Sequence, residues 1–402
     1  MDAIDCFWFR RDMRLEDNVG LFEALQAGGP VLPVFIFDKA ILDPLPARDA
    51  RLVFIHLTLQ SLQKQLRSQG SDLYTVHAHP LQAWRHLLAQ YPIRHVYTNH
   101  DFEPYAKERD LDVARLLREH GADLKHYKDH VLFEADEVMT QQGKPYTVFT
   151  PYKKRWLAQA NQTTYAHHPS EDHLRTLLKV QEPLPMPGLQ EMGFEFFEPN
   201  IPPKSVDEEL IRHYEEQRDY PAAQHTSRLG VHLRFGTLSI RRLADHTRTL
   251  SKAFQNELIW RDFYAQILHH YPHVVDHSFR PEYDAIPWRN NEAEFQRWCE
   301  GTTGYPMVDA GMRQLNEIGY MHNRVRMITA SFLTKHLLVD WRWGEAYFGE
   351  KLLDYELASN NGGWQWAAGS GTDAAPYFRI FNPATQAERF DPQGRYQQHW
   401  LP

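Results

Sequence analysis

One segment of the chain reads Asp354-Tyr355-Glu356-Leu357-Ala358-Ser359-Asn360-Asn361-Gly362-Gly363-Trp364-Gln365-Trp366-Ala367-Ala368-Gly369, a composition that suits neither an ordinary helix nor an ordinary strand. Paired glycines allow a sharp turn or the close approach of a ligand to the backbone. Tryptophan offers flat surfaces that stack on rings, and asparagine offers a donor and an acceptor to a ring edge. The segment therefore indicates either a pocket for a large planar heterocycle or a tight turn before a core helix with buried tryptophans.

The residues upstream of this segment carry two helical patterns. The first is Tyr305-Pro306-Met307-Val308-Asp309-Ala310-Gly311-Met312-Arg313-Gln314-Leu315, which begins at a proline and places apolar residues on one face. The second is Asn323-Arg324-Val325-Arg326-Met327-Ile328-Thr329-Ala330-Ser331-Phe332, with Arg324 and Arg326 close to its start. Two helices are thus expected before the tryptophan-rich segment.

Three strings in this region resemble the photolyase/cryptochrome flavoprotein family. They are Thr303-Gly304-Tyr305-Pro306-Met307-Val308-Asp309-Ala310, Met321-His322-Asn323-Arg324-Val325-Arg326-Met327 and Asn360-Asn361-Gly362-Gly363-Trp364-Gln365-Trp366-Ala367, the last continued by Gly371-Thr372-Asp373-Ala374-Ala375-Pro376-Tyr377-Phe378-Arg379. Strings of this length and composition are highly specific. The resemblance covers nearly the whole chain and is strongest to class I cyclobutane-pyrimidine-dimer photolyases.

The overall composition is that of a globular protein with room for two domains. The chain has 402 residues, 42% of them hydrophobic and 13% aromatic, and no apolar run long enough to span a membrane. With only Cys6 and Cys299, neither a disulfide framework nor a cysteine zinc site is expected, no metal is predicted, and a cytoplasmic location fits. The first residues lack the basic region of a signal peptide. The net charge of −8 means that binding to nucleic acid would need a local basic patch.

The first 130 residues alternate short apolar runs with helical patterns, which predicts an α/β doubly wound parallel sheet domain. The expected strands are Ile4–Phe9, Val31–Phe37, Leu73–Val76, His95–Thr98 and Leu124–Tyr127. No Gly-x-Gly-x-x-Gly follows the first strand, so the dinucleotide fingerprint is missing. Residues 131–204 read as an interdomain connector that becomes rich in proline. Residues 205–402 read as all-α, and the resemblance makes them a domain that binds flavin adenine dinucleotide (FAD).

The loop after the first strand contains Arg10, Arg11 and Arg14. These arginines either form a salt-bridged strand-to-helix connection or belong to the amino-terminal signature of the family. In the family this domain can hold a light-harvesting antenna, often a folate or a deazaflavin. Where folate-binding relatives place Asn-Glu, this chain has Tyr105-Ala106, which lacks the carboxylate that a pterin needs. The resemblance thus disfavours folate and leaves another antenna, or none.

The string His225-Thr226-Ser227-Arg228-Leu229-Gly230 combines hydroxyl groups, a guanidinium and a glycine. Such groups suit a phosphate, but the same pattern fits an ordinary helix N-cap. By resemblance, the string binds the pyrophosphate of FAD, with Tyr214 close by.

Four residues, Glu257, Trp260, Arg261 and Tyr264, share one face of a predicted helix. On spacing alone, this face is either an exposed salt-bridged stripe or the wall of a polar pocket. The resemblance implies the pocket, in which Glu257 hydrogen-bonds and protonates a pyrimidine lesion, Trp260 packs against it and Arg261 borders the flavin.

The resemblance also assigns the redox residues. Asn360 is expected beside the flavin N5, where a neutral amide favours the fully reduced cofactor that is active in repair. Trp364, Trp341 and Trp288 are expected to carry electrons between flavin and surface, although each alone would fit an ordinary core tryptophan. The other residues expected around the flavin are Asn323, Arg326, Asp354, Tyr355 and Glu356.

The function implied by the resemblance is light-driven repair of cyclobutane pyrimidine dimers in DNA by a monomeric enzyme. The excited, reduced FAD would pass an electron to a lesion flipped out of the duplex. The residues expected to contact lesion or DNA are Glu257, Trp260, Arg261, Tyr264, Asn323, Arg324, Met327, Trp366 and Gln386. Arg379 and Arg389 are either further phosphate contacts or ordinary surface charges.

Three rival hypotheses stay open. They are a cryptochrome-like blue-light signalling photoreceptor, a (6-4) photolyase, and flavin storage or electron transfer without DNA. Asn360, Glu257, Trp260 and Met327 favour repair over signalling. The chain ends at Pro402, whereas relatives usually continue through another helix or two, which fits a truncated chain or a naturally short member.

Overall fold

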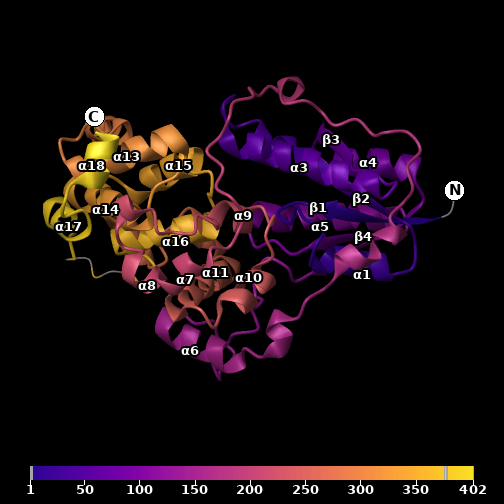
Figure 1. Ribbon diagram of the computed structural model, residues 1–402, viewed down its shortest axis with the longest axis horizontal. Helices are drawn as coiled ribbons and strands as arrows, with labels where there is room; N and C mark the ends of the chain where they lie inside the picture. The colour runs from indigo at the N-terminus through magenta and orange to yellow at the C-terminus, as the bar shows by residue number, and fades with distance from the viewer. Residues whose placement is uncertain (1–2, 375, 377–378, 402) are drawn as a thin grey trace. The chain divides into compact units, whose positions relative to one another are not determined.

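The computed structural model describes residues 3–374, 376 and 379–401 and falls into two compact units (Figure 1). Unit 1 comprises Met1–Leu132, Asn161–Lys204 and His232–Asp245, and unit 2 comprises Phe133–Ala160, Ser205–Val231 and His246–Pro402. Each unit thus joins segments that are distant in the sequence. The domain boundaries expected at residues 130 and 204 stay a prediction, because a compact unit need not be an independently folding domain.

Unit 1 is built on a parallel sheet with the strand order β3-β2-β1-β4-β5. The strands are β1 (Ile4–Phe9), β2 (Val31–Asp38), β3 (Tyr74–Ala78), β4 (Ile93–Asn99) and β5 (Asp123–Tyr127). The strand order changes direction at β1, which makes the sheet doubly wound. All five expected strands are confirmed, with ends that differ by at most two residues.

Helices cover both faces of this sheet. Trp8 of β1 packs with Trp84 and Leu116 on one face. Phe7 points to the other face, where a Cβ on Gly20 would lie 2.9 Å from its ring. Because both faces are covered, β2 is buried along its whole length. The helices of unit 1 are α1 (Val19–Gln26), α2 (Lys39–Leu42), α3 (Ala50–Ser68), α4 (Pro80–Gln90) and α5 (Pro104–Glu119), with the short turns η1 (Gln162–Tyr165), η2 (Ser170–Thr176) and η3 (Gln190–Met192).

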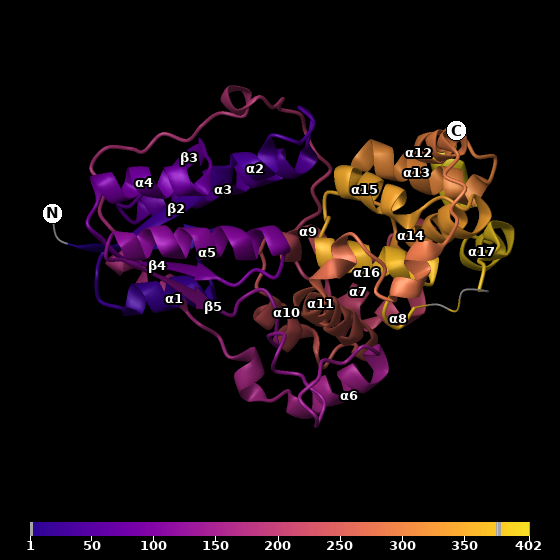
Figure 2. The ribbon, with the colours of Figure 1, turned by 180° about the vertical axis from the view of Figure 1, so that it is seen from behind.

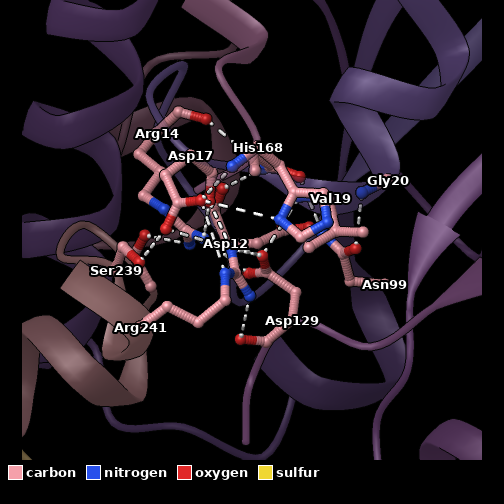
Figure 3. Close-up of polar contacts among 12 residues, drawn as sticks. Asp12, Arg14, Asp17, Val19, Gly20, Asn99, Asp129, His168, Ser239 and Arg241 are labelled. Carbon is pink, nitrogen blue, oxygen red and sulfur yellow. Dashed lines mark hydrogen bonds and ion pairs between the residues drawn. The ribbon is translucent and has the colours of Figure 1, made fainter. Parts of the chain in front are cut away.

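The loop between β1 and α1 enters a buried ion network (Figure 3). Arg14 donates to both carboxylate oxygens of Asp129, at 2.7 and 2.8 Å, and Arg241 donates to the same carboxylate at 2.9 Å. Arg241 also pairs with Asp17 at 3.2 Å. The other two arginines of the loop are paired as well, Arg10 with Asp110 and Arg11 with Asp101. The expectation of a salt-bridged connection is therefore confirmed.

The regular elements described in unit 2 are helices and short helical turns, beside one isolated β-bridge between Met139 and Pro145 (Figure 2). They are α6 (Phe149–Gln159), α7 (Glu208–Arg212), α8 (Tyr214–Gln217), η4 (Pro221–Ala223), α11 (Lys252–His270), η5 (Pro272–Val275), η6 (Pro281–Ala285), α12 (Glu292–Glu300), α13 (Pro306–Ile318), α14 (Asn323–Ser331), the π-helical turn η7 (Phe332–His336), α15 (Trp341–Lys351), α16 (Leu357–Ala368), α17 (Pro383–Phe390) and α18 (Arg395–Trp400). Two further helices, α9 (Gly230–Arg234) and α10 (Ile240–Thr247), cross the division between the units. The expected helices at Pro306 and Asn323 are confirmed as α13 and α14. None of the described helices is long and apolar enough to cross a membrane.

The glycine- and tryptophan-rich segment forms α16, which ends at Gly369 with a φ of 86°. The expectation that its paired glycines make a turn before a helix is wrong, because both glycines lie inside the helix. Gly362 instead allows α11 to approach closely, since a Cβ there would lie 2.2 Å from the ring of Tyr264. Trp364 is 2% exposed, so it is a core residue, as the second interpretation predicted.

Candidate functional site

The four residues predicted to share a face of α11 are Glu257, Trp260, Arg261 and Tyr264, and two of them contact α16. Tyr264 packs its ring against the backbone of α16, and Nη2 of Arg261 lies 3.3 Å from Oε1 of Glu356, the N-cap residue of α16. All four side chains are half-buried. The face is therefore the wall of a polar cluster and not an exposed stripe.

Glu257 forms an ion pair with Arg218, the residue that ends α8. Burial raises the pKa of Glu257, and the guanidinium of Arg218 opposes this rise. Both side chains keep about a third of their surface exposed, at 36% and 35%. The guanidinium also lies 5.7 Å from the ring centroid of Tyr214, which packs edge-on against Phe254. A carboxyl with a raised pKa and access to solvent can give a proton to a bound base.

Trp260 lies in a stack of aromatic rings. Phe149 of α6 is parallel to it, with an angle of 5° and ring centroids 3.5 Å apart, and Tyr264 lies 5.5 Å away at 26°. Sequence reasoning did not identify Phe149. Its position just before Pro151 and Tyr152, in a segment that resembles the family's interdomain segment, was the signal that could have found it.

A second cluster joins α14 to the segment before α16. Nη2 of Arg326 lies 3.0 and 2.9 Å from the two carboxylate oxygens of Asp354, and its Nε donates to the carbonyl of Met321. A Cβ on Gly230 would lie 2.9 Å from Oδ2 of Asp354. A larger residue at position 230 would force Asp354 to shift.

Tyr320 contacts two residues of the string that was expected to bind a phosphate. Its hydroxyl lies 3.0 Å from Oγ1 of Thr226, and the guanidinium groups of Arg228 and Arg326 lie 4.4 and 5.7 Å from its ring centroid. Arg228 has a left-handed backbone with a φ of 51°, which turns the chain into α9. The backbone N–H of Leu229 donates to the hydroxyl of Ser227 at 3.5 Å. The arrangement brings two cations to one aromatic ring, and Tyr320 itself was missed from the sequence.

Asn360 is held by α15. Its Nδ2 donates to the backbone carbonyl of Glu345 at 3.2 Å and to the carboxylate of the same residue at 2.9 Å. The hydroxyl of Tyr355 lies 3.4 Å from that carboxylate, and burial raises the pKa of Glu345. Because the nitrogen of the Asn360 amide is used in this way, its oxygen is the atom that can accept a hydrogen bond from a ligand.

The start of α14 presents a second arginine. Arg324 donates to Asp219 at 2.8 Å and stacks over Phe390 at 4.2 Å. Nδ2 of Asn323 lies 4.0 Å from the sulfur of Met327, one turn further along. Arg389 lies near the same ring of Phe390, and Trp366 and Arg379 lie near the ring of Phe381. Arg379 and Arg389 are exposed, and Gln386 on α17 is half-buried.

The three tryptophans assigned to electron transfer belong to one apolar cluster. Trp364 and Trp341 are buried in it, at 2% and 1% exposure, and Trp288 is half-buried against it. Trp298 lies 6.0 Å from Trp364 in the same cluster. No role was predicted for Trp298, because a tryptophan alone carries no positional information.

Tyr105 of unit 1, which replaces the amide of folate-binding relatives, donates its hydroxyl to Asp38 at 2.6 Å. Its ring also lies 5.8 Å from the guanidinium of Arg109. The antenna expectation stays a prediction.

Two family models match the chain. The model for DNA photolyase matches residues 6–172, and the model for the FAD binding domain of DNA photolyase matches residues 254–402. Deoxyribodipyrimidine photo-lyase from a Synechococcus strain is 39% identical over 100% of this chain and 88% of its own length.

Solved structures agree with these matches. A bacterial class III photolyase from Agrobacterium tumefaciens has a TM-score of 0.86 and 34% identity, covering 100% of this chain and 87% of its own. A cryptochrome from Synechocystis has a TM-score of 0.84 and 26% identity, covering 100% of this chain and 89% of its own. The fold expected from the sequence, an α/β domain followed by a helical domain, is confirmed by these likenesses.

Proposed function

The chain belongs to the DNA photolyase family of FAD-dependent enzymes, and we propose that it repairs cyclobutane pyrimidine dimers in DNA by light-driven electron transfer. The likeness to deoxyribodipyrimidine photo-lyases over the full chain supports this substrate. We further propose that the protein acts as a monomer on damaged DNA, and that it is closest to class I.

The observation that carries the proposal is the packing of α11 on α16. Through the contacts of Tyr264 and Arg261, it places the residues expected to meet a lesion next to the helix of Asn360, which is expected to meet the flavin. A cofactor and a substrate must be close for an electron to pass between them.

The residues of unit 2 fit FAD. Arg228 and Arg326 around Tyr320 would supply cations for its pyrophosphate. Bound and fully reduced, FAD supplies the electron that opens the cyclobutane ring, which no side chain can supply. The remaining members of its expected site are Tyr214, Thr226, Ser227, Leu229, Gly230, Arg261, Asn323, Asp354, Tyr355, Glu356 and Asn360.

Asn360 would favour the reduced cofactor through the orientation of its amide. Glu345 accepts a hydrogen bond from the amide nitrogen of Asn360, so that the amide oxygen can accept a hydrogen bond from the N5–H of a reduced flavin. Trp364, Trp341 and Trp288 would re-reduce the cofactor from the surface, because their shared cluster runs from buried to half-buried.

Glu257 and Trp260 would hold the lesion. The carboxyl of Glu257, with its raised pKa, can hydrogen-bond and protonate a pyrimidine carbonyl, while the aromatic stack of Trp260 offers a surface for it. We propose Met327 and Trp366 as further pocket residues, and Arg324 and Gln386, with Arg379 and Arg389, as contacts to the DNA backbone.

The test is repair of a dimer-containing oligonucleotide by purified, pre-reduced protein, with blue light and in the dark. The proposal predicts that absorbance of the restored pyrimidines returns only in the light. Bound FAD without repair in the light would contradict it.

A second candidate is a blue-light signalling photoreceptor, which the likeness to the Synechocystis cryptochrome favours. This candidate predicts a photoreducible flavin with no repair of the same oligonucleotide. The one assay thus separates the two functions.

A further inference from the structure

The C-terminal end of α11 carries a cluster of side chains that the repair chemistry does not use. His269 and His270 are the last two residues of the helix, and Asp136 comes from the connector before α6. Each offers one ligand atom, and these three atoms all lie within 4.8 Å of one another. The two imidazole rings are 5.0 Å apart at an angle of 76°.

His270 is positioned by the connector. Its Nε2 lies 3.2 Å from the carbonyl oxygen of Ala135 and 3.4 Å from Oδ1 of Asp136. Its side chain is 17% exposed, whereas that of Asp136 is 75% exposed. The connector thus holds the imidazole in place, and a metal bound at Nε2 would replace its hydrogen bond to Ala135, while the exposed carboxylate can rotate toward the ion.

Two imidazoles and one carboxylate make a donor set that prefers one class of metal ion. Neutral imidazole nitrogens bind zinc and neighbouring transition metals well, whereas magnesium and calcium prefer oxygen. Zinc sites with three protein ligands and a water are common, with bonds of about 2.0–2.2 Å to nitrogen and oxygen. Ligand atoms around such an ion lie about 3.3 Å apart, so the three side chains would have to move closer together to share an ion, and the exposed Asp136 is free to do so.

The position on the helix adds to this preference. The last turn of an α-helix exposes carbonyl oxygens and the negative end of the helix dipole, which stabilise a cation. α11 has 19 residues, so this end is well formed.

We propose that Asp136, His269 and His270 bind a divalent transition metal of the zinc class, with water completing its coordination. The ion would tie the connector at Asp136 to the end of the helix that carries Glu257 and Trp260. The site is independent of the repair function. It departs from the expectation of no metal, which stays a prediction until zinc binding is measured.

The test uses the full-length protein and zinc as the probe. Isothermal titration should give one high-affinity Zn²⁺ per chain that competes with Co²⁺ but not with Mg²⁺. Bound Co²⁺ should show visible bands beyond the absorption of oxidised flavin. Because Asp136 is exposed, Asp136→Asn should fold normally and weaken zinc binding at least tenfold, and His269→Ala should weaken it further.

The matched control is His273→Ala, which removes an exposed histidine in the turn after α11. This variant should bind zinc like the parent chain. The proposal is overturned if the parent chain binds no zinc, or if Asp136→Asn and His269→Ala bind it as tightly as His273→Ala does.

Discussion

Both units contain networks of arginine and carboxylate side chains. The network of unit 1 is buried, which we call closed, and that of unit 2 is partly exposed to solvent, which we call open. Around Asp129 in unit 1, Arg14, Arg241 and Asp17 are between 0% and 6% exposed. In unit 2, the pair of Arg218 with Glu257 is about one third exposed, and that of Arg326 with Asp354 about one quarter.

The difference separates ion pairs that hold a fold from ion pairs that can receive a ligand. A buried pair that loses one partner leaves an uncompensated charge in a medium of low dielectric, which is strongly destabilising. A half-exposed pair contributes little to stability, because water screens it. Such a pair can therefore exchange one partner for a phosphate or a base at small cost, and the repair proposal requires this of unit 2.

The largest expected effect on stability is that of Asp129→Ala. The substitution leaves Arg14 and Arg241 without their shared carboxylate, so the free energy of unfolding should fall by about 3–5 kcal/mol. Urea unfolding measures the loss. Asp112→Ala, which removes an exposed partner of Arg115, is the control and should cost less than about 1 kcal/mol. Equal losses in the two variants would show that burial of an ion pair does not set its contribution to stability.

His322 should make the free energy of unfolding depend on pH. Burial lowers its pKa from 6.5 to about 4, with Arg326 adding to the effect, and its Nδ1 caps α14 by accepting from the N–H of Arg324 at 3.1 Å. Because the folded state keeps the imidazole neutral, its contribution is complete above pH 6.5 and is lost as the pH falls toward 4. The loss should reach about 3 kcal/mol.

The comparison variant is His322→Asn, which keeps a capping acceptor but cannot titrate. Urea unfolding between pH 4 and pH 7 should show the stability of the parent chain falling toward that of the variant as the pH decreases. Parallel curves for the two proteins would contradict the assignment.

The sequence predicted the architecture because periodic patterns report which side of an element is buried. Strand β2 is a continuous apolar run and is buried on both faces, and α13 begins at Pro306 as expected. The pattern could not show that Gly362 sits inside a helix, because that depends on how closely Tyr264 of another helix approaches.

Only part of the site was predicted, because the partners of its residues are distant in the sequence. The resemblance marked Asn360 and Glu257, but their partners Glu345 and Arg218 lie 15 and 39 residues away in sequence. No local sequence pattern indicates these pairings, because the partners come together only when the helices pack against each other.

Trp364→Phe should have a smaller effect on stability and a selective effect on function. Loss of part of a ring that packs on Gly344 should cost about 1–2 kcal/mol. Photoreduction of oxidised flavin should slow at least tenfold, while repair by pre-reduced enzyme stays within twofold. Trp298→Phe is the matched control, since it shrinks a neighbouring ring of the same cluster and should leave photoreduction normal. Equal photoreduction in both variants would exclude Trp364 from the electron path.

Glu257→Ala should have the smallest effect on stability and the largest on repair, which makes it the sharpest test of the open network. Its pair with Arg218 is exposed to water, so the free energy of unfolding should change by less than about 1 kcal/mol. The rate of repair should fall about a hundredfold or more, because a general acid contributes about a hundredfold to ten-thousandfold. The flavin spectrum should be unchanged. Glu208→Ala, which removes an exposed partner of Arg212, should match it in stability and repair at the normal rate. If Glu257→Ala instead unfolded as easily as Asp129→Ala, the open pair would be a structural one, and the proposed role of Glu257 toward the lesion would lose its support.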